Sequence, residues 1–276
     1  MSIPVPVLRP PAGEPVRSAF PKLDVSDSAL RGRTFRRVVV VADRFAQFSR
    51  NDRVLTLSEL RAMVATASDL PAGFEWVVHP GLGVEPADLE FLEPACDDAS
   101  PMVRLDDSGR FPAPVPAALV HKHRQENVLL AGIETPTDRF CTAELRVHRD
   151  NELVLDHHTG EHVQGIVIIE AIRQIGLAQF ETSYRPQLPG DYAGVWKRLD
   201  LSFDNFLFPL RAIVEFEITE ADLSREANLK FRATSRVRQN GTVVAEARVE
   251  YSMIRQERID ALEHRSARNA VEAHLA

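Results

Sequence analysis

The second half of the chain has the clearest pattern of hydrophobic and polar positions. Residues 127–133 and 140–145 are short apolar runs on either side of Pro136-Thr137-Asp138, a pattern that predicts two strands and a turn. Residues 166–180 are apolar on nearly every side, which is typical of a helix buried in a core. Further strands are predicted at 196–206, 212–219, 229–238 and 243–253. Asn240-Gly241 favours a hairpin between the last two, because this dipeptide accepts positive φ at both positions.

This order of elements predicts an α+β fold in which an antiparallel sheet wraps around one long central helix. The segment before it has a different pattern, in which short β-branched runs such as Val38–Val41 alternate with helical spacing. That alternation predicts a small α/β segment of unknown role. Gly81-Leu82-Gly83 lacks the third glycine of a dinucleotide-binding loop, so that function is not expected. The expected organisation is an irregular proline-rich arm at 1–33, the α/β segment at 34–96, a linker at 97–116, the main domain at 117–255, and a C-terminal helix or tail at 256–276.

Composition excludes several classes of function. The net charge is −7 and basic residues form no long run, so a nucleic-acid partner is not expected. No apolar run reaches the roughly 18 residues of a membrane span, and the proline-rich start does not resemble a secretory signal. The two cysteines, Cys96 and Cys141, lack CxxC spacing. A cytoplasmic protein without a bound cofactor is the expectation.

Three polar residues interrupt the predicted buried helix. Glu170, Arg173 and Gln174 stand at positions i, i+3 and i+4, so they share one helix face. Burial is expected to raise the pKa of Glu170, which would suit acid/base chemistry near neutral pH. Arg173 could orient Glu170, bind a phosphate or stabilise developing negative charge. The alternative is that Glu170 only pairs with Arg173 or with a second subunit.

Three motifs together resemble the signature of a known family. They are His121-Lys122-His123 followed by Asn127, the stretch 156–167 that begins Asp156-His157, and Glu170-Ala171-Ile172-Arg173-Gln174. This combination, over roughly residues 117–255, is similar to the A-factor biosynthesis (AfsA-type) hotdog family. The sequence departs from the family in two respects. Residues 1–115 contain no second copy of the motifs, and Gln164 stands where the family commonly has proline.

The resemblance implies a hotdog fold and an activity on acyl thioesters. The implied reaction transfers a β-ketoacyl group from an acyl carrier protein to the hydroxyl of a small phosphorylated acceptor. Such a step belongs to the biosynthesis of γ-butyrolactone or butenolide signals and to secondary metabolism. Glu170 and Arg173 match residues considered functional in the family. A homodimer is also expected, because one hotdog leaves its helix partly open.

The loop that enters the predicted helix supplies further candidates. His157, which matches the family's Asp-His pair, is the candidate general base, and His162 is a candidate substrate-binding residue. The backbone amides of Gly165 and Ile166 are expected to bind a thioester oxygen, because they lie at the positive end of the helix dipole. Gln174 is placed with the substrate-binding group, although a tie between helix and strand suits it better.

Several alternatives stay open from the sequence. Each histidine could simply bond to the backbone of its loop. His158 and His162 satisfy the H-x-x-E-H zinc pattern, but Gly160 between them favours a loop over the helix that zinc binding needs, so no metal is expected. The chain could also be a hotdog dehydratase or thioesterase acting on acyl-carrier-protein or CoA thioesters, or a non-catalytic thioester-binding partner. Trp196 and Phe203 are expected to be core, dimer-interface or acyl-tunnel residues.

Overall fold

The structure is a computed structural model, and it describes residues 29–30, 33–65, 74–95, 102–106, 111–154 and 160–276. Most of the arm predicted at 1–33 lies outside these residues, as do His157 and His158. None of the helices in the described ranges is long and apolar enough to cross a membrane.

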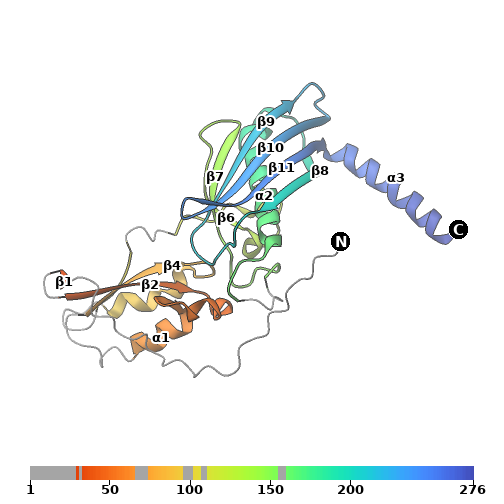
Figure 1. The fold of residues 1–276 in the computed structure, drawn as a ribbon. Coiled ribbons are helices and arrows are strands. Elements are labelled where there is room, and N and C mark those ends of the chain that lie inside the picture. The colour runs from red at the N-terminus through yellow and green to blue at the C-terminus, as the bar shows by residue number, and fades with distance from the viewer. Residues whose placement is uncertain (1–28, 31–32, 66–73, 96–101, 107–110, 155–159) are drawn as a thin grey trace, which may run out of the picture.

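A six-stranded antiparallel sheet forms the larger part of the molecule, in the spatial order β6-β7-β9-β10-β11-β8 (Figure 1). Its strands are β6 (Leu130–Glu134), β7 (Phe140–Leu145), β8 (Tyr192–Phe203), β9 (Ile213–Asp222), β10 (Asn228–Gln239) and β11 (Thr242–Arg255). The hairpin predicted at Asn240-Gly241 joins β10 to β11, and both residues have positive φ. The predicted order of two strands, a helix and four strands is confirmed.

The helix α2 (Gly165–Ser183) lies against the inner face of this sheet (Figure 1). Val167, Ala171, Ile175 and Phe180 on α2 are almost completely buried. Along β10, buried residues alternate with more exposed ones, as expected for a sheet with one face on a core. The helix is therefore apolar on most sides because it packs on the curved sheet and also on η6 (Ala117–Val120) and η8 (Arg185–Gln187).

An irregularity in β8 changes which of its residues face the helix. Glu250 pairs with Arg198, but Tyr251 pairs with Trp196, so Lys197 is an extra residue in β8. An extra residue reverses the alternation of side chains along a strand. Gly194 and Trp196, which precede Lys197, face a cavity beside α2, and Leu199 and Leu201, which follow it, pack on the core.

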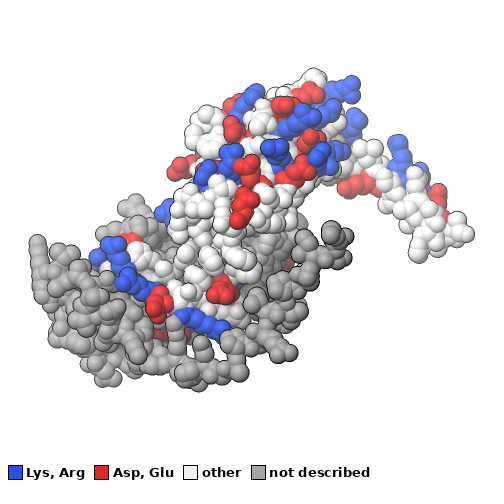
Figure 2. All heavy atoms as spheres, viewed as in Figure 1, with Lys and Arg blue, Asp and Glu red and all other residues white. Residues whose placement is uncertain are grey.

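The outer face of the large sheet carries interspersed charges of both signs (Figure 2). They pair across neighbouring strands, for example Arg238 with Glu215 at 3.0 Å and Arg236 with Glu246 at 2.8 Å. The last helix, α3 (Gln256–Leu275), follows β11 and projects away from the sheet (Figure 1). Ile259 is its only buried residue.

A second, smaller sheet precedes the large one and is mostly parallel. It is formed by β1 (Ala29–Leu30), β2 (Arg33–Val41), β3 (Val54–Thr56), β4 (Phe74–Pro80) and β5 (Met102–Leu105), with the helix α1 (Leu57–Ala65) packed against it. β5 pairs with β4 although it lies in the proline-rich stretch 97–116. Short 3-10 helices are η1 (Asp43–Phe45), η2 (Phe48–Arg50), η4 (Pro86–Asp88), η5 (Glu90–Ala95), η6 (Ala117–Val120), η7 (Gln125–Asn127) and η8 (Arg185–Gln187).

The two sheets meet at the carboxyl ends of β2 and β4. The amide of Leu82, just after β4, donates a hydrogen bond of 3.0 Å to the carbonyl of Pro209 in the larger unit. A Cβ on Gly81 would stand 2.5 Å from that same carbonyl oxygen, so the close approach requires glycine. The Phe48 and Phe208 rings stack across the junction with centroids 5.6 Å apart. Residues of the smaller unit next to the junction, such as Val41 and Phe45, consequently belong to the core of the larger unit, and α1 and the other side of β2 pack in a second cluster.

Candidate active site

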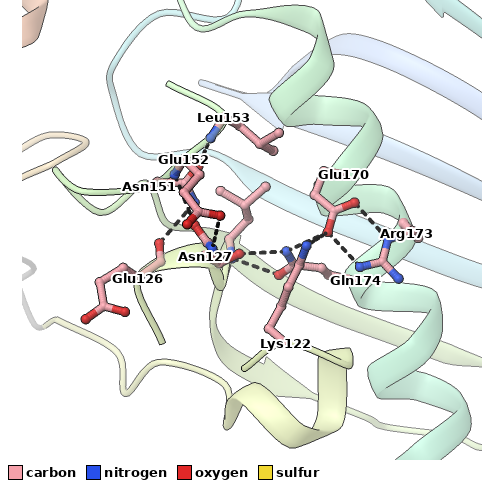
Figure 3. A network of polar contacts seen from close by, with 10 residues as sticks. Lys122, Glu126, Asn127, Asn151, Glu152, Leu153, Glu170, Arg173 and Gln174 are labelled. Atoms are coloured by element: carbon pink, nitrogen blue, oxygen red, sulfur yellow. Dashed lines mark hydrogen bonds and ion pairs between the residues drawn. The ribbon is translucent and has the colours of Figure 1, made fainter. Parts of the chain in front are cut away.

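The polar face of α2 points toward the loop between η6 and β6, where the two segments share a network of polar contacts (Figure 3). Glu170, Arg173 and Gln174 come from α2, and Lys122 and Asn127 come from the loop. The spacing of the three helix residues therefore places them together, as the sequence predicts.

The Glu170 carboxylate is the centre of this network. The Arg173 guanidinium donates two hydrogen bonds to it, from Nε to Oε2 and from Nη2 to Oε1, both of 2.7 Å. Lys122 Nζ lies 2.8 Å from Oε1, and Gln174 Nε2 donates to the same oxygen at 3.0 Å. The Glu170 side chain is only 15% exposed. Four donated contacts thus hold a mostly buried carboxylate in its ionised form.

The expectation of a raised pKa for Glu170 is wrong. Burial alone raises this pKa, but the hydrogen bonds from Arg173, Lys122 and Gln174 together outweigh it and lower the pKa to about 2. Burial always raises a carboxyl pKa, and the net shift is upward only when nearby cations and hydrogen-bond donors do not outweigh it. At neutral pH Glu170 is therefore a weak base and cannot serve as an acid, and its contacts suit the positioning of Lys122 and Arg173.

Gln174 joins the helix to the segment that leads into β6. Its amide oxygen accepts a hydrogen bond of 2.8 Å from Leu129 N, and its Nε2 also donates to the Asn127 carbonyl at 2.9 Å. Both ends of this completely buried amide are occupied by protein groups. These contacts are those of a structural tie.

Lys122 is the charged member of the network that the sequence did not single out as functional. The chain turns just before it, where His121 has a left-handed backbone with φ of 53°. His121 Nε2 lies 3.0 Å from Glu181 Oε1 on α2, and Lys122 N donates to the Ala117 carbonyl at 2.9 Å. These contacts fix the turn so that the Lys122 side chain reaches Glu170. The only signal in the sequence was the position of Lys122 within the family motif.

An apolar cavity of about 250 Å³ lies beside the network, between α2 and the large sheet. Its wall is formed by residues of α2, β8, β9 and β11: Ile172, Arg173, Gly176, Leu177, Gly194, Trp196, Phe216, Val249, Tyr251 and Met253. Arg173 belongs both to this wall and to the ionic network. One side chain therefore connects a charged compartment with an apolar one.

The N-terminus of α2 lies about 7.5 Å along the helix axis from Glu170, at 1.5 Å per residue. The N-cap residue Gln164 makes no side-chain capping bond, and no hydrogen bond from the amides of Gly165 and Ile166 joins them to the described part of the chain. A Cβ on Gly165 would approach the Phe203 ring to 2.9 Å, so this ring covers the first turn. The two amides remain candidate oxyanion donors.

The candidate histidines do not join the network within the described residues. The His162 ring packs on Phe206, with centroids 5.2 Å apart. His157 lies outside the described residues, as does His158 of the zinc pattern. Among the residues whose positions are described, no group of three His, Cys, Asp or Glu could hold a metal ion.

The network carries an excess of positive charge, because one carboxylate faces two cations. Lys122 and Arg173 are about a quarter and a third exposed, so both reach solvent. The two hydrogen bonds from Arg173 to Glu170 use Nε and Nη2, so Nη1 is the guanidinium nitrogen that this pair leaves for an anionic ligand. This geometry suits a small anion next to an apolar chain.

A family model matches residues 104–255, more than half of the chain, and its description is an A-factor biosynthesis hotdog domain. The chain belongs to this family. The resemblance noted in the sequence and the predicted hotdog fold are both confirmed. Lys122, Glu170, Arg173 and Gln174 all lie within the matched hotdog domain, whereas most of the smaller sheet lies before it.

Solved structures provide more distant similarities. A dehydratase heterocomplex from Xenorhabdus doucetiae is 18% identical, covers 55% of this chain and 98% of its own, and has a TM-score of 0.43. A mutant thioesterase from Pseudomonas aeruginosa is 13% identical, with coverages of 63% and 98% and a TM-score of 0.33. A hypothetical thioesterase from Streptococcus pneumoniae, solved with coenzyme A, is 12% identical, with coverages of 45% and 87% and a TM-score of 0.32. The search of curated proteins found no match to this sequence.

Proposed function

We propose that this protein transfers a β-ketoacyl group from an acyl thioester to the hydroxyl of a small phosphorylated acceptor. The observation that carries the proposal is the position of Arg173, which lies in the ionic network and in the wall of the apolar cavity. An acyl chain in the cavity and a phosphate on the Arg173 and Lys122 cations would bring the two reactants together. Family membership supports the same substrate class.

In the proposed reaction the acceptor hydroxyl attacks the thioester carbonyl carbon. A carbon–oxygen bond forms, the carbon–sulfur bond breaks, and the carrier leaves as a thiolate, which takes up the proton that a base removes from the hydroxyl. The hydroxyl proton passes to a base, for which His157 remains the candidate because Glu170 is too weakly basic. The amides of Gly165 and Ile166 would stabilise the negative charge that develops on the carbonyl oxygen.

The lowered pKa of Glu170 argues against the alternative that the protein is a dehydratase. Dehydration needs a group that donates a proton to the departing hydroxyl, and a carboxyl group with a pKa of about 2 has no proton to give near neutral pH. A thioesterase would need only water as acceptor, so the acceptor experiment below distinguishes it.

The proposal includes a homodimer and an acyl-carrier-protein donor. β8 is the edge strand of the large sheet, and its outer edge pairs with no strand in the described part of the chain. The cavity reaches this edge at Gly194 and Trp196, so a second copy paired along β8 would close it. Sedimentation equilibrium should give twice the mass of the chain, and a monomer at all concentrations would contradict the dimer.

The experiment is an acyl-transfer assay with a 3-oxoacyl thioester, carried either by an acyl carrier protein or by CoA. Acceptors are three-carbon hydroxy phosphates and their unphosphorylated parents, and products are identified by mass spectrometry. The expected product is the acyl ester of the phosphorylated acceptor. Free acid without acceptor would indicate a thioesterase, and binding without turnover would indicate a non-catalytic partner.

A further inference from the structure

The cavity beside α2 has one polar side chain that the network does not use. Tyr251, on β11, belongs to its wall and is 5% exposed. Its hydroxyl oxygen is buried and has no hydrogen-bond partner in the described part of the structure. A buried hydroxyl without a partner costs free energy, so it is an unusual group to keep inside a core.

Tyr192 provides a contrast within the same hydrophobic core. Its hydroxyl donates a hydrogen bond of 3.0 Å to the Glu226 carbonyl, which is the ordinary arrangement for a buried tyrosine. Tyr192 is not part of the cavity wall. The unpaired hydroxyl thus belongs to the tyrosine that lines the cavity.

The Tyr251 ring is firmly held. It stacks on Phe231 with centroids 5.1 Å apart and packs on Phe216, which also lines the cavity, at 6.3 Å. The extra residue in β8 lies next to the Trp196–Tyr251 pair, so the pairing register between β8 and β11 shifts at this point. Burial, with smaller contributions from Tyr184 and Cys141, raises the pKa of Tyr251, so the hydroxyl stays protonated and can donate.

We propose that the Tyr251 hydroxyl donates a hydrogen bond to the keto oxygen of the bound acyl chain and so selects 3-oxoacyl over saturated thioesters. This inference rests on the proposed function, because it assumes that the cavity takes the acyl chain. Arg173 lies in the wall of the same cavity, so the thioester can face the ionic network while the chain extends toward Tyr251. A saturated chain would leave the hydroxyl unpaired, and a site with an unpaired buried donor discriminates against such a ligand.

The test compares the binding of 3-oxoacyl-CoA and saturated acyl-CoA of equal chain length by titration calorimetry. Wild type, Tyr251→Phe and the control Tyr192→Phe are measured. Wild type should prefer the 3-oxo chain by roughly five- to tenfold, the usual contribution of one hydrogen bond. Tyr251→Phe should lose this preference while binding the saturated chain as well as wild type. Tyr192→Phe should keep the preference, and thermal unfolding confirms that each variant is folded.

Failure of this inference is distinct from failure of the proposed function. Equal binding of both chains by wild type, or an unchanged preference in folded Tyr251→Phe, overturns the role of Tyr251 alone. A preference that depends on Tyr251, without transfer to any phosphorylated acceptor, supports the role of Tyr251 and overturns the transfer reaction. If neither thioester binds, both proposals are overturned.

Discussion

Arg173 holds the Glu170 carboxylate through two parallel hydrogen bonds of 2.7 Å, and the same arginine forms part of the wall of the apolar cavity. Two bonds from one planar group fix its orientation as well as its position. Glu170 can thus act through Arg173, because it fixes the orientation of the guanidinium toward a ligand in the cavity.

Arg173→Lys should keep the positive charge and lose this fixed orientation, because an ammonium group cannot form the parallel pair. We predict at least about a tenfold fall in kcat/KM for acyl transfer to a phosphorylated acceptor, the loss expected when one charge-assisted hydrogen bond is removed. The measurement is an initial-rate assay against acceptor concentration. Arg198→Lys is the control, because Arg198 forms an exposed pair with Asp200. Wild-type kinetics in Arg173→Lys would remove Arg173 from the site.

Glu170→Gln should change how stability depends on pH. The folded pKa of about 2 lies below the ordinary value of 4.5, so the ionised carboxylate stabilises the fold fully above about pH 4.5. That stabilisation is lost as the pH falls from 4.5 toward 2. Glu170→Gln should therefore be less stable than wild type near neutral pH, by about 1–3 kcal/mol, and the difference should shrink below pH 4.5.

Urea unfolding at several values between pH 3 and pH 7 measures this difference. Glu263→Gln is the control, because Glu263 is an exposed residue of α3. A difference between Glu170→Gln and wild type that stays constant over this range would show that ionisation of Glu170 does not stabilise the fold.

The sequence predicted the elements whose pattern is local. The apolar run after Gly165 predicts α2, because a helix buried on most sides has few polar residues. The alternating segments predict the strands of the large sheet, because only one face of that sheet is buried. The helical spacing of Glu170, Arg173 and Gln174 likewise predicted that they share a face. These features depend only on neighbours along the chain.

The features that the sequence did not predict depend on contacts between distant segments. Lys122 reaches Glu170 across 48 positions because a left-handed turn at His121 aims it there. Arg173 is evident in the sequence as a neighbour of Glu170, but its two hydrogen bonds to the carboxylate and the contact from Lys122 depend on the folded geometry, so burial alone predicts the wrong direction for the pKa shift. The cavity and the Tyr251 hydroxyl on its wall also arise from three-dimensional packing, since Tyr251 fits the alternation of β11 like any other buried residue.

Gly81→Ala should weaken the junction between the two sheets. The added Cβ would stand 2.5 Å from the Pro209 carbonyl and 2.8 Å from Val41, so the two units must move apart. We predict a loss of about 1–3 kcal/mol in the free energy of unfolding, the usual cost of overpacking. Limited proteolysis should also cut the junction faster than in wild type.

Gly241→Ala is the matched contrast for this change. Gly241 has φ of 79°, and no atom of the residues that the structure describes lies within 4 Å of its Cβ position, so its substitution strains the hairpin without touching the junction. It should lower stability modestly and leave proteolysis of the junction unchanged. Equal proteolysis of Gly81→Ala and wild type would mean that the junction tolerates the methyl group.

Gly194→Ala should shorten the acyl chain that the cavity accepts. Gly194 lies in the cavity wall on the edge strand β8, and an added Cβ would approach a terminal methyl of Leu177 to 3.0 Å and the Met253 sulfur to 3.3 Å. Both neighbours also line the cavity, so the methyl group or the side chains that it displaces must occupy space available to the ligand. The cavity of about 250 Å³ is small, so the loss of one methyl volume should be measurable.

We predict that Gly194→Ala lowers kcat/KM for longer acyl thioesters by about tenfold, while shorter chains react as in wild type, because a misfit of one methylene in an apolar pocket costs about 1–3 kcal/mol. Rates are measured over a series of chain lengths. Ala193→Val is the control, because the next residue along a strand points to the opposite face of the sheet. Thermal unfolding of Gly194→Ala and Ala193→Val shows whether each variant is folded at the assay temperature, so that a selective loss of long chains is not ascribed to unfolding. Identical chain-length profiles for Gly194→Ala and wild type would show that the acyl chain binds elsewhere.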